Sequence, residues 1–345
     1  MQDIIQIIDD ITVNPMVSSV RKSSGFYPSS ASVKFNDPVF GSKVIGSCLR
    51  KEWYSFQGYA TSDGTTAEAE DKKAIGDYIS QRFVEKFKVA GLYVADEVSF
   101  FHEEMNVSGR IDILIKDPYK APKPPQRPAT QDLIGVEIKS TGGYHNIKGP
   151  IQSTKDTPLA PKLEHILQVM VYLDYYSKFG IDRWILIYQD RDSMRKQWHK
   201  VSIADDGSAV IVNQEQTHVY KHINIGAIKS RYNDLAKYLA QKELPPRDYA
   251  MQYSNKYIYD LYKGDLLTKT NAAKVEKIVT KYTTNKTLDL NTIEPILDMG
   301  DFQCRYCQYK SMCWSESPTK QMAPAPVQAP DVEQNSEPDD AEGFV

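Results

Sequence analysis

The chain has 345 residues, of which 41% are hydrophobic and 25% are charged. This composition is close to that of globular domains and too apolar for a largely disordered chain, so we expect a sizeable core in one large or two ordinary domains. No apolar run reaches the roughly 18 residues of a membrane span, and the first residues are acidic where a signal peptide is basic. We therefore expect a soluble cytoplasmic protein, located in the host cytoplasm if its source is a virus.

The net charge of −3 is spread unevenly along the chain. No lysine or arginine follows Lys320, but six acids do, so residues 1–320 carry +3, from 42 basic and 39 acidic side chains. A weakly basic body with an acidic end is compatible with a polyanionic partner, although an ordinary mixed surface is the simpler explanation of the charge alone.

Hydrophobic periodicity predicts the secondary structure in chain order. Residues 1–47 are expected to form an N-terminal arm with a short helix at Ile4–Ile11. Helices are predicted over 65–88 and 162–178, strands over 92–101, 107–115 and 133–140, and a hairpin from 184–188 and 197–203. We expect a core over 48–205, a mainly helical extension over 206–300, a cysteine segment over 301–316 and a disordered acidic tail over 317–345.

Charged residues alternate with apolar ones in the second and third predicted strands. The isoleucines at 111, 113 and 115 point to one face of their strand, and Asp112 points to the other. In the next strand, Glu137 and Lys139 share the face opposite Val136 and Ile138. If the two strands are neighbours, Asp112, Glu137 and Lys139 converge on one patch.

Two carboxylates held close together repel each other unless a cation compensates their charge. A hard divalent ion such as Mg²⁺ or Mn²⁺ prefers carboxylate, carbonyl and water ligands, and it can activate a water molecule and bind a phosphate oxygen. The neighbouring Lys139 could position that water or neutralise charge at phosphorus. The pattern is short, and a solvent-facing set of charges on an amphipathic sheet explains it equally well.

A second segment adds a resemblance to a known family. The predicted helix places Gln168 and Tyr172 four residues apart on one face. With the segments G-R-I-D at 109–112, V-E-I-K at 136–139 and Q-V-M-V-Y at 168–172, the sequence resembles the RecB-type branch of the PD-(D/E)XK nuclease superfamily. The resemblance implies an α/β fold with a restriction-endonuclease-like core, in which helices flank a mixed central sheet.

The resemblance also implies the roles of individual residues. Glu68, Asp112 and Glu137 would bind the divalent ion together with the backbone carbonyl of Ile138, and Lys139 would organise the attacking water. These four side chains form the expected catalytic set. Gln168 and Tyr172 would hold the DNA backbone and brace the site.

Two features of the match leave alternatives open. The family often has proline where Ile111 stands, and Glu70 competes with Glu68 for the upstream acid. The runner-up metal ligands are three histidines, His102, His145 and His165.

The four cysteines of the chain are Cys48, Cys304, Cys307 and Cys313. In a reducing compartment, three cysteines within ten residues indicate a metal centre more than disulfides. Four thiolates suit either tetrahedral Zn²⁺ or a [4Fe–4S] cluster. One cysteine before the core and three after it is similar to the layout of CRISPR-associated RecB-like exonucleases, and this resemblance implies the cluster. The cluster would tie distant parts of the chain together.

We expect a Mg/Mn-dependent deoxyribonuclease, more specifically an exonuclease that acts on DNA ends or single strands in recombination, repair or replication. A metal-activated water would hydrolyse the phosphodiester bond. The alternative is a catalytically silent or zinc-stabilised DNA-binding or processing subunit of a larger complex. The acidic tail, which ends in Phe344 and Val345, resembles docking tips of replication proteins, although a solubilising tail is the simpler interpretation. Basic residues interleaved with aromatic ones could contact DNA: Tyr144, His145, Lys148, Lys155, Lys162, Arg191, Arg195, Lys196, Trp198 and Lys200.

Overall fold

The computed structural model describes residues 25–37, 41–62, 67–118, 133–155, 157–213, 216–284 and 289–315, with only the backbone described for 67–70. The short helix expected at 4–11 and the tail expected over 317–345 lie outside these residues.

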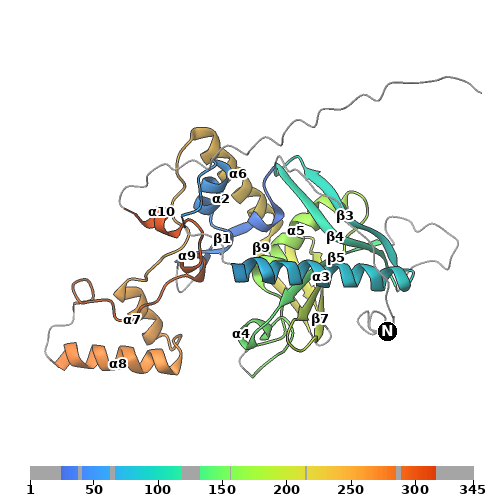
Figure 1. Ribbon diagram of the computed structural model, residues 1–345. Helices are drawn as coiled ribbons and strands as arrows, with labels where there is room; N and C mark the ends of the chain where they lie inside the picture. The colour runs from blue at the N-terminus through green and yellow to red at the C-terminus, as the bar shows by residue number, and fades with distance from the viewer. Residues whose placement is uncertain are drawn as a thin grey trace, which may run out of the picture.

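A mixed seven-stranded sheet forms the centre of the molecule, and helices cover its faces (Figure 1). The expected α/β architecture with a mixed, helix-flanked sheet is therefore confirmed. The strands lie in the order β3-β4-β5-β6-β7-β8-β9, in which β5 and β6 are parallel and all other neighbours are antiparallel. The strands are β3 (Tyr93–His102), β4 (Val107–Lys116), β5 (Leu133–Thr141), β6 (Trp184–Asp190), β7 (Lys196–Ile203), β8 (Ser208–Val212) and β9 (Thr217–Asn224).

Two long helices cover opposite faces of this sheet. On one face, α3 (Ala67–Val89) packs Phe83 and Phe87 against apolar residues of β4, β5 and β6. On the other face, α5 (Leu163–Ser177) is the crossover helix between the parallel strands β5 and β6. The even alternation of β5 therefore sends Val136 and Ile138 toward α3 and Glu137 and Lys139 toward α5.

The pairing of β4 with β5 is short. It runs from Lys116 and Leu133 to Ile113 and Val136, and the two strands continue beyond that point without a ladder between them. Asp112 is the first residue of β4 past the last pair. Ile111 was expected to share a face with the next two isoleucines, but it packs in the cluster on the α5 side, whereas Ile113 and Ile115 pack under α3.

The part of the expected N-terminal arm that is described belongs to the core. Residues 32–37 and 41–46 pair as antiparallel strands, and Phe26 and Val33 are buried. The elements of this segment are η1 (Pro28–Ser30), β1 (Ser32–Asp37) and β2 (Gly41–Gly46), and α2 (Leu49–Phe56) follows. β1 packs against α6 and β2 packs against α5. These tertiary contacts stabilise the two strands, although their polar sequence alone does not favour strand structure.

The expected extension over 206–300 is helical only from Ile225 onward, because β8 and β9 continue the sheet. Two of its helices, α7 and α8, lie apart from the sheet (Figure 1) and share a separate apolar cluster around Ile258 and Val275. No described helix combines the length and the apolar character needed to cross a membrane. The remaining helices are α4 (Tyr144–Ile147), α6 (Ile225–Gln241), α7 (Asn255–Lys263), α8 (Lys269–Thr284), α9 (Phe302–Arg305) and α10 (Lys310–Trp314).

Candidate active site and cysteine pocket

Asp112 and the strand that carries Glu137 meet where β4 separates from β5. The backbone N–H of Ile138 donates a hydrogen bond of 2.7 Å to Asp112 Oδ2. This side chain therefore satisfies a backbone group that the neighbouring strand no longer reaches. The bond holds the Asp112 carboxylate beside the residues on either side of Ile138, which are Glu137 and Lys139.

The side chains of Glu137, Lys139 and Gln168 form a closed ring of hydrogen bonds. Lys139 Nζ donates to Glu137 Oε1 at 2.6 Å and to Gln168 Oε1 at 2.9 Å. Gln168 Nε2 donates to Glu137 Oε1 at 2.8 Å and to the hydroxyl of Tyr172 at 2.6 Å. Because a lysine only donates, the Gln168 oxygen must face Lys139, which fixes the orientation of the amide. We call Asp112, Glu137, Lys139, Gln168 and Tyr172 the carboxylate–lysine site.

Charge and burial perturb the groups of this site. Burial and the Glu137 carboxylate raise the pKa of Asp112 well above its usual range. Burial alone would lower the pKa of Lys139, but the carboxylates of Glu137 and Asp112 outweigh it and raise the pKa, so the ammonium is charged at neutral pH. Burial and the same carboxylates raise the pKa of Tyr172, which is 1% exposed and remains a phenol. Two acids and one ammonium leave the site short of positive charge.

Glu137 has one oxygen that nothing in the described chain satisfies. Its Oε1 accepts from Lys139 and Gln168, whereas its Oε2 is buried with no hydrogen-bond partner among the described residues. A buried carboxylate oxygen without a partner is costly. A divalent cation beside Oε2 would satisfy this oxygen and would also counter the repulsion from Asp112, so the donor set present here fits a hard metal ion.

The other expected metal ligands are placed less completely. Glu68 lies in the first turn of α3, and its side chain is outside the described atoms. Ile138 lies between Glu137 and Lys139 in β5, and the expected role of its backbone carbonyl as a metal ligand stays a prediction. His145 is exposed on α4.

His165 lies beside the carboxylate–lysine site but is engaged elsewhere. Its Nδ1 lies 2.8 Å from the hydroxyl of Tyr188, and this hydroxyl accepts the backbone N–H of Lys162 at 3.0 Å. The Tyr188 hydroxyl therefore links the His165 ring to the backbone of Lys162. Burial, Lys139 and Lys162 lower the pKa of His165 well below 6.5, so the ring is neutral. This contact was not predicted, although His165 precedes Gln168 by one helical turn.

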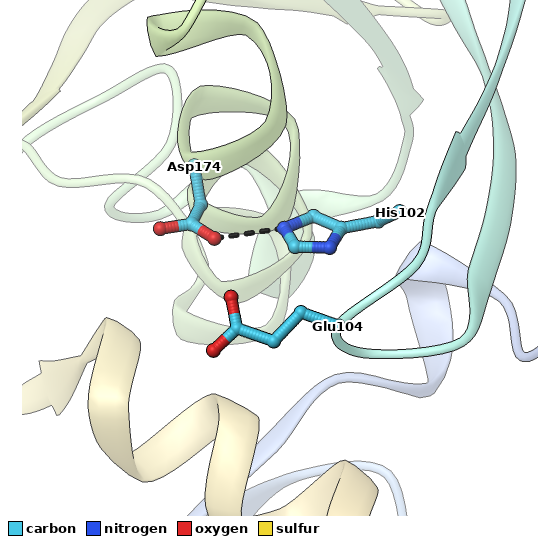
Figure 2. Close-up of side chains that lie close together, drawn as sticks. All are labelled: His102, Glu104 and Asp174. Carbon is cyan, nitrogen blue, oxygen red and sulfur yellow. Dashed lines mark hydrogen bonds and ion pairs between the residues drawn. The ribbon is translucent and has the colours of Figure 1, made fainter.

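His102 belongs to a different cluster. Figure 2 shows His102 from the end of β3, Glu104 just after it and Asp174 from α5, and their ligand atoms lie within 4.8 Å of one another. His102 Nε2 donates to Asp174 Oδ2 at 2.8 Å. Lys229 Nζ from α6 donates to Glu104 at 2.8 Å and lies 3.0 Å from Asp174. Lys229 and His102 engage these carboxylates in hydrogen bonds, so the cluster links the end of β3 to α5 and α6. Its three ligand atoms also lie close enough together to hold a metal ion.

The four cysteines line one pocket. Cys48 lies directly before α2, and the other three lie in and between α9 and α10. Among the described residues, no three cysteine sulfurs lie within 4.8 Å of one another. Arg50 and Lys310 line the same pocket. The backbone N–H of Tyr309 donates to Cys307 Sγ at 3.4 Å.

Burial keeps two of these thiols protonated when nothing binds them. Burial and the carboxylate of Asp248 raise the pKa of Cys48 from 9.0 to about 11. Burial and the neighbouring Cys48 raise the pKa of Cys304 to about 12.

The basic residues that were expected to contact DNA divide into two groups. The first group surrounds α4, where Lys148 Nζ lies 4.1 Å from the centre of the exposed Tyr144 ring. The second group surrounds the turn between β6 and β7, except that Trp198 packs against the apolar cluster under α3. The proximity of this turn to α3 was not predicted, although Tyr78, Arg82 and Lys86 follow one another at helical spacing.

No family model matches the sequence, and no curated protein matches it. One solved structure, titled "Crystal structure of SSO0001", aligns with 66% of this chain and 81% of its own, at 16% sequence identity and a TM-score of 0.32. A TM-score this low does not establish a shared fold.

Proposed function

We propose that the chain is a metal-dependent nuclease with a PD-(D/E)XK core that hydrolyses phosphodiester bonds of DNA. The observation that carries this proposal is the carboxylate–lysine site itself. Asp112 and Glu137 meet beside a charged lysine, and one buried oxygen of Glu137 has no partner among the described residues. Such a site needs a cation, and an ion held by carboxylates next to an ammonium suits a phosphate substrate.

Asp112 and Glu137 would hold the divalent ion, with Glu68 as the third acid of the expected set. The ion, when bound, would polarise the phosphate and lower the pKa of a water molecule. Lys139 Nζ is charged and can stabilise the negative charge that develops on the phosphate oxygens during attack.

Gln168 and Tyr172 would act mainly by positioning Lys139 and Glu137. Gln168 contacts both residues, and its second amide hydrogen goes to the Tyr172 hydroxyl. Since Tyr172 is buried, its hydroxyl supports the bracing role better than direct contact with DNA. Fixing catalytic side chains before the substrate arrives lowers the barrier, because no reorganisation is needed during the reaction.

We also propose that the cysteine pocket holds a [4Fe–4S] cluster with a structural role. All four cysteines line one pocket, and its basic residues Arg50 and Lys310 would offset the negative charge of bound thiolates. A single Zn²⁺ ion with bonds of about 2.3 Å requires sulfurs about 3.8 Å apart. The wider separation of the sulfurs favours a larger centre over zinc.

The nuclease proposal is tested by digestion of end-labelled single- and double-stranded DNA in Mg²⁺ or Mn²⁺. We expect the wild type to digest DNA and Asp112→Ala and Lys139→Ala to be inactive. Gln168→Leu should lower kcat by about 10- to 100-fold, because a hydrogen bond to a charged group contributes about 1.5–3 kcal/mol. Gln241→Leu, an exposed change at the end of α6, is the control and should leave the rate unchanged.

Equal digestion by the wild type, Asp112→Ala and Lys139→Ala would show that the site is wrongly assigned. DNA binding without digestion by any of the proteins would favour the catalytically silent subunit. End-labelled substrates also report the polarity of digestion and whether ends are required.

A further inference from the structure

A groove runs between α3 and the turn that joins β6 to β7. Its α3 side is built from residues that repeat every three or four positions, and its other side is the β6–β7 turn. Arg82 and Lys86 line the first side, and Arg191 and Lys196 line the second. Among the residues that the structure describes, no acid lines this groove. The apolar cluster that holds α3 on the sheet lies beneath it, because Ile79 and Phe83 belong to both.

The groove also exposes rings and apolar side chains that the core does not use. Tyr78 of α3 is 61% exposed, and Met194 in the facing turn is 58% exposed. Both line the groove together with the four basic residues. An exposed aromatic ring flanked by cations is the combination that binds the base faces and the phosphates of an unpaired strand.

The groove begins beside the strand that carries Glu137 and Lys139. Arg191 donates its backbone N–H to the carbonyl of Thr141, the last residue of β5, at 2.7 Å. A Cβ added at Gly142 would lie 3.1 Å from Arg191 Nε, so the glycine makes room for this arginine. On the α3 side, a Cβ added at Gly76 would lie 3.3 Å from Ser140 Oγ, directly after Lys139. Both walls therefore reach the end of the catalytic strand.

We propose that this groove binds a single strand of nucleic acid, which it guides along α3 to or from the carboxylate–lysine site. The inference rests on the proposed nuclease function and adds to it a second, basic surface on the α3 face of the sheet. Arg82 and Arg191 contact phosphates, and Tyr78 stacks on a base. A duplex would use the cations but not Tyr78, because its base faces are covered. An acidic peptide would also use the cations without a requirement for stacking.

The test measures binding separately from cleavage. Fluorescence anisotropy of a labelled oligothymidylate is recorded in EDTA, with the full chain carrying Lys139→Ala, over a series of salt concentrations. On this background, Arg82→Glu with Arg191→Glu removes the two cations, and Tyr78→Ala removes the ring. Lys277→Glu, an exposed charge reversal on α8, is the matched control. Circular dichroism and thermal unfolding confirm that each variant is folded.

We expect the double charge reversal to weaken binding by at least about tenfold. It should also make the plot of log association constant against log salt concentration less steep by about 1.4, because each lost phosphate contact on a single strand accounts for about 0.7. Tyr78→Ala should weaken binding of the single strand by about tenfold and leave duplex binding unchanged. Lys277→Glu should stay within about twofold of the background protein, because a surface change away from the contact has little effect.

The inference is overturned if Tyr78→Ala binds the single strand normally, or if the double charge reversal weakens binding no more than Lys277→Glu does. An acidic peptide of sequence 331–345 serves as a competitor. The inference is also overturned if this peptide displaces the labelled oligonucleotide from the wild type at a lower concentration than unlabelled oligothymidylate does, and fails to displace it from the double variant. Normal binding by the groove variants together with DNA digestion by the wild type would reject the groove alone. Absence of both binding and digestion would reject the proposed function as well.

Discussion

At Glu137, the two oxygens of one carboxylate have different surroundings. Oε1 accepts from both Lys139 and Gln168, whereas Oε2 is buried without a partner among the described residues. Because Oε1 carries the hydrogen bonds that orient the side chain, an ion can bind at Oε2 without breaking them. These hydrogen bonds would therefore fix the geometry of the carboxylate before any ion binds, which is how supporting hydrogen bonds act around a metal ligand.

His199 on β7 makes folding dependent on pH. It is completely buried, and its Nε2 donates to the Pro150 carbonyl at 2.9 Å. Burial lowers its pKa from 6.5 to about 4, so the unfolded chain binds a proton that the folded protein rejects between these values. The stabilisation is complete above pH 6.5 and is lost as the pH falls toward 4. Between pH 7 and 4, His199 should contribute about 3 kcal/mol to the fall in the free energy of unfolding. We expect His199→Gln to remove this contribution, as measured by urea unfolding at several pH values.

Gln can keep a hydrogen bond to the Pro150 carbonyl but does not titrate, so this variant isolates the proton. Gln241→Leu at the exposed end of α6 changes no titrating group, so it is the control and should have the same pH dependence as the wild type. Parallel stability curves for His199→Gln and the wild type between pH 4 and 7 would contradict the prediction.

Among the elements, β5 has the most tightly constrained position. It pairs with β4 on one side and, from Gly135 to Thr141, with β6 on the other. It also lies between α3 and α5. Gly135 near its start allows the close approach to β6, because a Cβ at this position would lie 2.3 Å from the Trp184 indole. Trp184 is itself fully buried and cannot move aside.

We expect Gly135→Ala to lower the free energy of unfolding by about 1–3 kcal/mol or more, because the new methyl group must displace Trp184 or separate the strands. Urea unfolding measures the change. Gly264→Ala at the end of α7 is the control, since its φ is −86° and the nearest atom is the flexible Leu266 side chain at 3.3 Å. A loss of stability no larger than that of Gly264→Ala would show that Trp184 accommodates the methyl group.

Sequence periodicity predicted α3, β3, β4, β5, α5, β6 and β7 with ends within about two residues, but it did not predict the short helix α4. It missed β1, β2, β8 and β9. β1 and β2 have few apolar positions and β8 has only five residues, so these strands depend on tertiary contacts rather than on strong alternation. A period of two was enough to place Glu137 and Lys139 on one face.

The contacts between elements could not be predicted in this way. The bond from Ile138 N–H to Asp112 exists because β4 and β5 separate at that residue, and no local pattern encodes the separation. The bond between His165 and Tyr188 joins a helix to a strand and depends on how they pack. The groove between α3 and the β6–β7 turn has the same origin.

For the whole molecule, the cysteine pocket connects distant parts of the chain. Cys48 contributes from the start of the described core, and the other three cysteines contribute from residues 304–313. Arg247 reinforces this connection, because its Nη2 donates to the Cys313 carbonyl at 2.6 Å and its guanidinium lies 4.2 Å from the Trp314 ring. A bound cluster would act as a cross-link over a long loop.

We expect the wild type, purified without oxygen, to contain about four iron and four sulfide per chain. Cys48→Ser should lose this iron and lower the unfolding temperature by about 5–10 °C, because a long-range cross-link is removed. Hydrogen exchange should increase in α2 and residues 301–315 and remain unchanged in α5. Gln303→Ala, which lines the same pocket without a sulfur ligand, should keep the iron. Zinc in place of iron in the wild type, or full iron in Cys48→Ser, would contradict the assignment.

The distance along the chain between the walls of this pocket has a consequence for biosynthesis. A ribosome that has released Cys48 must still translate more than 250 residues before Cys304 exists, since 304 − 48 = 256. The nascent chain can form the central sheet during this time, but the four-sulfur pocket is complete only once Cys313 has left the exit tunnel. If the pocket holds the proposed cluster, its assembly follows folding of the sheet, and a chain deprived of iron would have the sheet but lack the cross-link.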